Sequence, residues 1–195
     1  MNTDLPHRNA NMLRVITVRG LLLVASLTAA LALPVAAQPH LVPVPAHAAQ
    51  APHPCQNIQL LVSAHSSEGA AGTIAVIYRI HNLRNQPCTL SGYPGVQFLD
   101  RNFASLPTTV YRGGGKVGNV PVRTLTLGPS GNAYFALFYS DVPTSGAPPC
   151  ADARYLMIFA PNTYLPVVTY AAPGGALHEC AGIVHVSPVT AQPTY

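Results

Sequence analysis

The sequence contains few charged residues, and acidic residues are the scarcer kind. Only six of its 195 residues are aspartate or glutamate, against ten arginines and lysines. The acidic residues after position 50 are far apart in the sequence: Glu68, Asp100, Asp141, Asp152 and Glu179. Hydrolases of the glycosidase type need two carboxyl groups at a defined separation. The sequence therefore gives no support to an enzyme that works through a carboxylate pair.

A clustered basic patch is also missing. Three of the ten basic residues and one of the six acidic residues fall in the first 37 positions, so the rest of the chain is close to charge balance. The basic residues that remain are scattered singly: Arg79, Arg84, Arg101, Arg112, Lys116, Arg123 and Arg154. Nucleic-acid binding needs a basic stripe or face, so we expect no nucleic-acid partner.

Cysteine is absent from the first fifty residues, and no two cysteines form a Cys-x-x-Cys pair. The missing pair argues against a zinc site or thioredoxin-like chemistry. The four cysteines, Cys55, Cys88, Cys150 and Cys180, indicate two structural disulfides in an oxidising compartment. Four cysteines allow three pairings, and sequence alone does not select one. Sequential pairing is favoured here because each bond would close a loop of about thirty residues, contributing on the order of 3.5 kcal/mol.

No apolar run reaches the length of about 20 residues that a membrane span needs. The longest run, residues 21–33, follows Arg8, Arg14 and Arg19, and small residues at 35–37 come after it. This order is typical of a secretory signal peptide, which we assign to residues 1–37. An uncleaved anchor is the alternative. We therefore predict a protein that is secreted or associated with the cell envelope, without stable membrane insertion after signal cleavage.

Residues 38–54 form a proline-rich segment that alternates with alanine, valine, glutamine and histidine. Proline fixes φ and removes hydrogen-bond donors, so the composition predicts an extended linker. His40, His47 and His53 lie on it at spacings of seven and six residues. Neutral imidazoles can gather around copper or zinc, so a metal-binding scavenger is one alternative function. Solvated histidines on a spacer are the favoured interpretation, and we assign no metal or other cofactor.

The pattern from residue 55 to 188 is that of short β-strands. Ile74, Val76, Tyr78 and Ile80 alternate with period two, as in a strand that is packed on one face and solvated on the other. Further strands are predicted between proline and glycine punctuation at residues 120–127, 133–139, 155–160, 166–170 and 182–187. No stretch shows a capped helical stripe. We predict an all-β, immunoglobulin-like antiparallel two-sheet sandwich held by disulfides, with residues 189–195 as a C-terminal tail.

The glycine-rich segment from Gly113 to Gly118 matches the Gly-x-Gly-x-x-Gly pattern of dinucleotide sites. That pattern needs a strand before it and a helix after it. Residues 119–123 instead resemble a strand, so we predict a loop without a nucleotide.

The strongest candidate for chemistry is the string His178-Glu179-Cys180, together with His185. A histidine beside a carboxylate can act as a general base or as an oriented metal ligand. An envelope hydrolase with its site near His178 and Glu179 is therefore a second alternative function. His185 alternates with apolar residues on a predicted strand, so a solvent-facing imidazole explains it equally. We assign no catalytic residue.

The string Cys-Thr-Leu-Ser-Gly-Tyr-Pro-Gly at residues 88–95 resembles the hallmark of a family of exported, mostly actinobacterial domains of unknown function. The similarity extends over residues 55–188 and includes all four cysteines. It implies a secreted or envelope-associated β-sandwich with no assigned enzymatic activity. Many relatives resemble lipoproteins, whereas this chain lacks a cysteine that could accept a lipid after the signal peptide.

The hallmark residues Ser91, Gly92, Tyr93, Pro94 and Gly95 predict a turn between two strands. Gly92 and Gly95 can adopt positive φ, and Pro94 fixes the turn and keeps Tyr93 extended. We expect Tyr93 to lock the turn, with ligand binding as its alternative role.

These features together predict an exported, non-catalytic module that binds an extracellular or cell-envelope component. Nine tyrosines supply the kind of side chain that binding surfaces favour. We expect loop residues 112–119 and 140–149 to contribute to that surface.

Overall fold

The structure is a computed structural model that describes residues 51–193. The predicted signal peptide at 1–37, most of the linker at 38–54, and His40 and His47 lie outside the described residues. Residues 51–193 contain no helix with the length and hydropathy of a membrane span.

The described chain is built from strands, with two short 3-10 helices between them, which confirms the predicted all-β class. In chain order the elements are β1 (His53–Pro54), η1 (Asn57–Gln59), β2 (Leu60–Ala70), β3 (Thr73–Asn82), β4 (Cys88–Leu90), β5 (Gly95–Leu99), β6 (Thr109–Arg112), η2 (Gly115–Val117), β7 (Leu125–Leu127), β8 (Asn132–Ser140), β9 (Ala151–Ala153), β10 (Tyr155–Phe159), β11 (Val167–Tyr170) and β12 (Leu177–Val186). Twelve strands form in the described chain, and several of them are only two or three residues long.

The largest sheet has the strand order β2-β3-β8-β12-β6, and β9 pairs with the first part of β12. A two-residue loop joins β2 to β3, and both of its residues, Ala71 and Gly72, have positive φ. Such a loop matches the right-handed twist of an antiparallel hairpin. β8 pairs with β3 along its full length, from Asn132 opposite His81 to Ser140 opposite Thr73.

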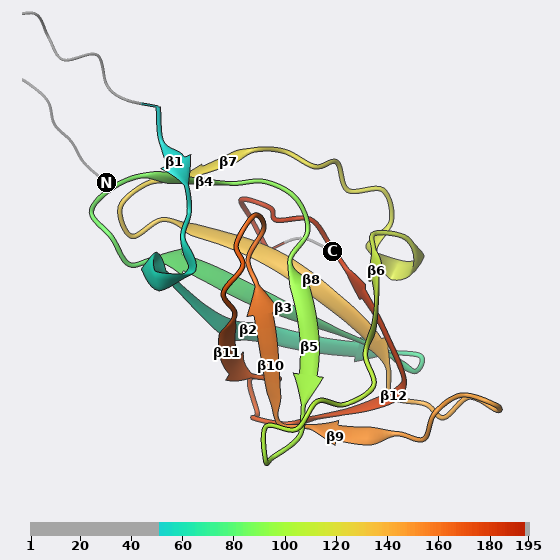
Figure 1. Cartoon of the computed structure of the whole chain (residues 1–195). Coiled ribbons are helices and arrows are strands. Elements are labelled where there is room, and N and C mark those ends of the chain that lie inside the picture. Colours follow the sequence, from blue (N-terminus) through green and yellow to red (C-terminus); the bar gives the residue numbers. More distant parts are fainter. Residues whose placement is uncertain (1–50, 194–195) are drawn as a thin grey trace, which may run out of the picture. The chain divides into compact units, whose positions relative to one another are not determined.

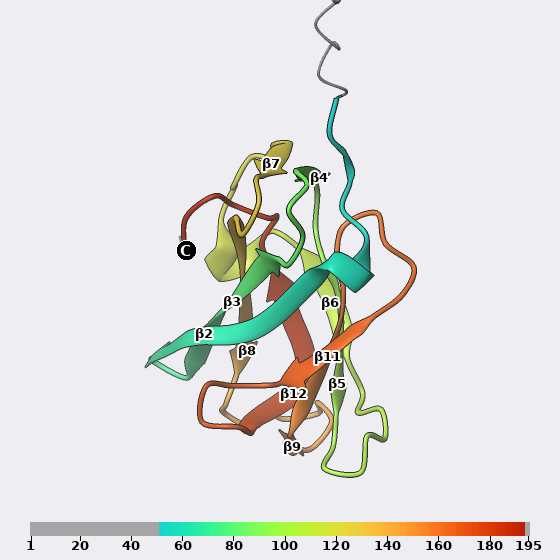
Figure 2. The same cartoon turned by 90° about the vertical axis from the view of Figure 1, so that its left-hand side faces the viewer.

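A second sheet, β11-β10-β5, lies in front of the large sheet in Figure 1, and Figure 2 shows the two layers from the side. A third, small sheet joins β1, β4 and β7. Most strand pairs are antiparallel, as predicted. β6 differs because it joins β12 in parallel, and the two-residue β1 joins β4 in parallel. The immunoglobulin-like arrangement of the strands stays a prediction.

The main hydrophobic core lies between the two layers. It joins Val76, Tyr78 and Ile80 of β3 with Phe98 of β5 and Leu156 of β10. This confirms the apolar face predicted from the period-two alternation of β3. Tyr78 is fully buried, stacks on the ring of Phe135 at 5.0 Å, and donates a hydrogen bond to the carbonyl of Ala171. A buried phenol needs such an acceptor.

The opposite face of β3 is covered in its middle, which corrects the prediction of a solvated face for this part of the strand. Ala75 and Ile77 are buried there beneath Val117 of η2, together with Ala136 and Phe138 of β8. The glycine-rich segment predicted as a loop therefore covers the outer face of the large sheet. Its four positive-φ glycines allow the tight path that this requires: Gly113, Gly114, Gly115 and Gly118.

The two disulfides join Cys55 to Cys88 and Cys150 to Cys180, which is the sequential pairing favoured by the sequence. Cys55 and Cys88 are 2% and 1% exposed, and the amide of Cys55 donates to the carbonyl of Thr89. This bond fastens the beginning of the domain to β4. The second bond fastens the segment before β9 to the middle of β12.

Two predicted boundaries differ from the structure. Only residues 125–127 of the predicted strand 120–127 pair with another strand. The predicted tail at 189–195 begins inside the domain, because Val189 is buried and Thr190 exchanges backbone hydrogen bonds with Tyr134 of β8. The packed domain therefore extends to at least residue 190.

β12 bends sharply in its middle, where its register with β8 shifts between Cys180 and Val184. Ala181 and Gly182 both have positive φ at this bulge, and the amide of Gly182 donates to a carboxylate oxygen of Glu179 at 2.9 Å. A Cβ on Gly182 would lie 2.7 Å from the carbonyl oxygen of Pro107. The bend therefore requires glycine at position 182.

Replacing Gly182 with alanine should lower the free energy of unfolding by at least about 2 kcal/mol. The cause is a strained left-handed backbone combined with the contact to Pro107. Gly174→Ala is the matched control, because nothing lies within 4 Å of its Cβ position and its φ is not positive. Urea denaturation of both variants measures the difference. Equal stabilities would show that the bend does not depend on glycine.

Candidate functional site

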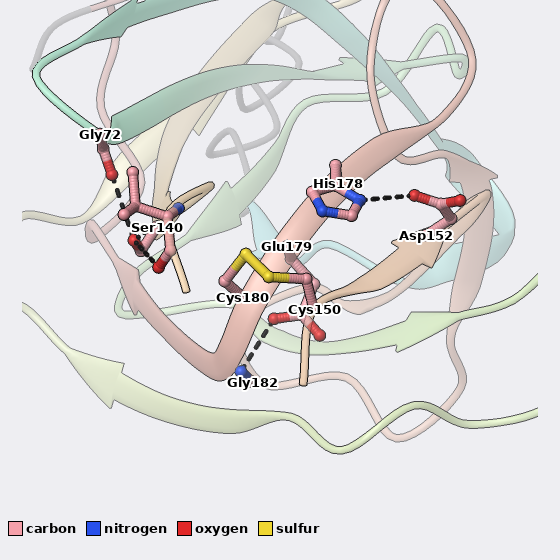
Figure 3. Close-up of a disulfide and its surroundings, with 9 residues drawn as sticks. Gly72, Ser140, Cys150, Asp152, His178, Glu179, Cys180 and Gly182 are labelled. Carbon is pink, nitrogen blue, oxygen red and sulfur yellow. Dashed lines mark hydrogen bonds and ion pairs between the residues drawn. A yellow bond between two sulfur atoms is a disulfide. The ribbon is translucent and has the colours of Figure 1, made fainter. Parts of the chain in front are cut away.

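His178 lies on the exposed face of β12, where it pairs with Asp152 of β9. Its Nδ1 is 2.7 Å from Oδ1 of Asp152, and the two residues are directly opposite each other in the strand register. Their side chains are 58% and 80% exposed. Figure 3 shows this pair beside the Cys150–Cys180 disulfide. Asp152, rather than the predicted Glu179, is therefore the carboxylate that orients His178.

Glu179 faces the other side of β12 and is 1% exposed. Neighbouring residues on a strand point to opposite faces, so His178 and Glu179 do not form the predicted dyad. Burial raises the pKa of the Glu179 carboxyl, while the Gly182 amide and the nearby His178 act in the opposite direction. The carboxyl closes the bulge of β12, which is a structural role.

His185 is held in a fixed orientation on the outer face of the large sheet. Its ring stacks on Tyr111 with centroids 5.3 Å apart, and Gly115 lies against it, where a Cβ would come within 3.2 Å of Cε1. Nδ1 lies 3.1 Å from the carbonyl oxygen of Gly113, so it donates its hydrogen there. Nε2 is then free to accept.

A shallow cavity of about 280 Å³ opens beside His185, with Lys116 and Thr144 in its lining. Residues of both predicted binding loops, 112–119 and 140–149, therefore meet at this cavity. The hallmark turn does not line this cavity, but it contacts the glycine-rich segment that does: the hydroxyl of Tyr93 lies against Gly113. Gly92 has the predicted positive φ, whereas Gly95 does not and instead leaves room for the ring of Phe159.

A stack of exposed and half-buried rings lies at one end of the β11-β10-β5 sheet. Phe103 stacks on Tyr155 at 4.3 Å, Tyr155 stacks on Tyr170 at 5.5 Å, and the guanidinium of Arg154 lies 5.2 Å from the centre of the Tyr170 ring. We call these four residues the aromatic ladder. Phe103 is 59% exposed and Tyr170 is 52% exposed.

Strand register extends the ladder into an apolar face on β10 and β11. Tyr155 and Tyr170 are opposite each other, and Met157 and Val168 form the next outward pair. Phe159 follows on β10 and covers Gly95 of β5. In the described chain, this outer face is partly exposed and carries no carboxylate on β10 or β11. Monomeric domains seldom leave such a face open to water.

Residue patterns did not reveal this face in advance. Residues 155–159 are apolar at every position, which is typical of a strand buried on both faces. The structure buries only the inward set, Leu156 and Ile158. Phe103 reaches the ladder from a loop in which its own φ is +63°, and no local pattern predicts that contact. The useful signal was the lack of polar residues on the outward side of this strand.

The model of a domain of unknown function (DUF4232) matches residues 55–190 of the chain. No curated protein and no solved structure matches it. The matched range ends where backbone pairing with β8 ends, at Thr190.

Replacing Glu179 with glutamine should stabilise the protein increasingly as pH rises. Because the folded-state pKa is raised, the unmodified protein keeps a proton that the unfolded chain has lost, and its stability falls from about pH 4 upward until the buried carboxyl ionises. Glutamine does not ionise. The melting temperature of Glu179→Gln relative to the unmodified protein should therefore rise between pH 4 and pH 8.

Glu68→Gln is the control, because Glu68 is exposed on β2. Its melting temperature should follow that of the unmodified protein at every pH. If the melting temperatures of Glu179→Gln and the unmodified protein differed by the same amount at every pH from 4 to 8, the raised pKa of Glu179 would be contradicted.

Proposed function

The chain belongs to this family of domains of unknown function (DUF4232), and we propose that it is an exported, non-catalytic module that binds a protein partner outside the cell membrane. The binding surface in this proposal is the outer face of β10 and β11, with the aromatic ladder at its end. The single observation that carries the proposal is the exposure of this face.

The composition of the face favours a protein as the partner. Tyrosine, phenylalanine, methionine and arginine are enriched at the cores of protein interfaces, and lysine, glutamate and aspartate are depleted there. All four of the enriched residue types occur on this face, at Phe103, Arg154, Tyr155, Met157, Phe159 and Tyr170. Binding energy in such interfaces is concentrated in a few residues, with tyrosine and arginine prominent among them.

Arg154 indicates the charge of the partner. It is exposed, lies over the ring of Tyr170, and forms no ion pair with any carboxylate of the described chain. A Cβ on Gly175 would lie 2.7 Å from Nη1 of Arg154, so Gly175 closely supports the guanidinium. A pre-positioned guanidinium loses little side-chain entropy on binding. An acidic side chain on the partner, which can accept two hydrogen bonds from it, fits this position.

Export and the lack of catalysis are parts of the same proposal. Two disulfides support export, because such bonds persist in oxidising compartments. The hydrolase alternative loses its main support because Glu179 is buried on the other face of β12 from His178. A scavenger that uses His40, His47 and His53 gains no support here, since two of these residues lie outside the described chain.

A photo-crosslinking aromatic residue placed at position 103 tests the proposal on intact cells of the producing organism. Irradiation should give one covalent adduct of defined mass between the chain and an envelope or extracellular protein. Adding Tyr170→Ala to the same chain should reduce its yield at least about tenfold, as expected when an interface hot spot is truncated.

The matched control carries the same photo-crosslinking residue at position 164. Tyr164 is 95% exposed and lies in the loop between β10 and β11, at the end of this hairpin away from the Tyr155–Tyr170 pair. It should give no defined adduct. A failure to form an adduct at 103, or equal adducts at 103 and 164, would rule out the ladder as the docking site.

A further inference from the structure

The pairing of β9 with β12 gathers four side chains with metal-binding atoms on one face. His178 lies directly opposite Asp152 in this register. Two residues further along each segment, on the same face, the disulfide joins Cys180 to Cys150. Side chains two residues apart on a strand share a face, so the two cross-strand pairs are adjacent, as Figure 3 shows.

The donor atoms of three of these residues are close enough to gather around one ion. The two Sγ atoms and a ring nitrogen of His178 all lie within 4.8 Å of one another. Ligand atoms of a tetrahedral zinc site are roughly 3.3–3.8 Å apart, given bonds of about 2.0–2.3 Å. Small side-chain rotations would therefore bring the three atoms to metal-binding distance once the sulfurs are no longer bonded.

Asp152 prepares His178 for this role. The carboxylate can only accept a hydrogen bond, so Nδ1 of His178 carries the hydrogen at 2.7 Å and Nε2 keeps its lone pair. Metal-binding histidines commonly donate their other ring N–H to a carboxylate, which fixes the ring and raises its basicity. The imidazole is 58% exposed, so an ion can reach it from solvent.

The other disulfide lacks these features. Cys55 and Cys88 are both almost fully buried, whereas in the second disulfide Cys180 is buried but Cys150 is half-buried. Within residues 51–193, the group formed by Cys150, His178 and Cys180 is the one place where three candidate metal ligands meet. A reductant can therefore reach the second disulfide more readily, and only there would the released thiols meet a histidine.

We propose that reduction of the Cys150–Cys180 disulfide creates a Cys2His site for a thiophilic divalent cation of the zinc type. A dithiol supplies two electrons and two protons to the two sulfurs and itself becomes a disulfide. The cation then binds the two sulfurs and Nε2 of His178, and the two thiol protons are released. Asp152 orients the histidine, and the fourth position stays open to solvent. This site is independent of the aromatic ladder and of the proposed partner.

Cobalt titration of the full chain tests the site, because Co²⁺ reports tetrahedral thiolate coordination in its visible spectrum. The chain reduced with a phosphine should bind one Co²⁺ with that spectrum, and the oxidised chain should not. His178→Ala should weaken binding at least about tenfold, and Asp152→Asn should weaken it roughly 10- to 100-fold, as loss of an orienting carboxylate does elsewhere.

Two cysteine variants form the matched control pair. Cys55→Ala/Cys88→Ala should keep the cobalt spectrum after reduction, and Cys150→Ala/Cys180→Ala should lose it. If either double variant does not fold, the comparison of His178→Ala with the unmodified chain decides the question, because both retain all four cysteines.

Equal cobalt affinity in His178→Ala and the unmodified chain would overturn the proposal, since the thiols alone would then explain binding. The same spectrum in the oxidised chain would also overturn it. Loss of the β-sheet circular dichroism on reduction, without recovery when Co²⁺ is added, would overturn the proposal too. The site needs β9 and β12 to stay paired.

Discussion

The bend of β12 is the constraint on which the rest of the domain depends. This strand pairs with β9 before the bend, with β8 on both sides of the bend, and with β6 after it. The bend forms where Ala181 and Gly182 adopt positive φ. The Glu179 carboxyl accepts a hydrogen bond from the Gly182 amide there. The Cys150–Cys180 disulfide fixes the strand just before the bend.

From this arrangement follow two surfaces with different chemistry. The core holds β10 and β11 against the large sheet through inward residues such as Leu156 and Ile158, so their outward residues form a rigid apolar face. Rigidity favours binding because less conformational entropy is lost on association. The pairing of β9 with β12 forms the second surface, where the exposed His178 and Asp152 lie beside a disulfide. The first surface suits a protein partner and the second suits a cation.

Much of the fold could be predicted because β-strand alternation and cysteine spacing are local signals. The inward face of β3 and both disulfide pairs agree with the sequence. Residues 120–124 alternate like a strand but pair with none, which a single segment cannot reveal. The candidate site was also harder to predict, because its contacts join segments that are far apart in the sequence. The partner of His178 is set by the register between β9 and β12, and the position of Phe103 is set by a loop with positive φ.

The central claim is that the apolar face with Arg154 binds a partner outside the membrane, and a binding isotherm on intact cells of the producing organism tests it most directly. The account predicts saturable binding of the purified chain and its loss when Arg154 is changed to glutamate, because that change places a negative charge opposite the acidic group of the partner. Equal saturable binding by both chains, or no saturable binding by the unmodified chain, would contradict the claim.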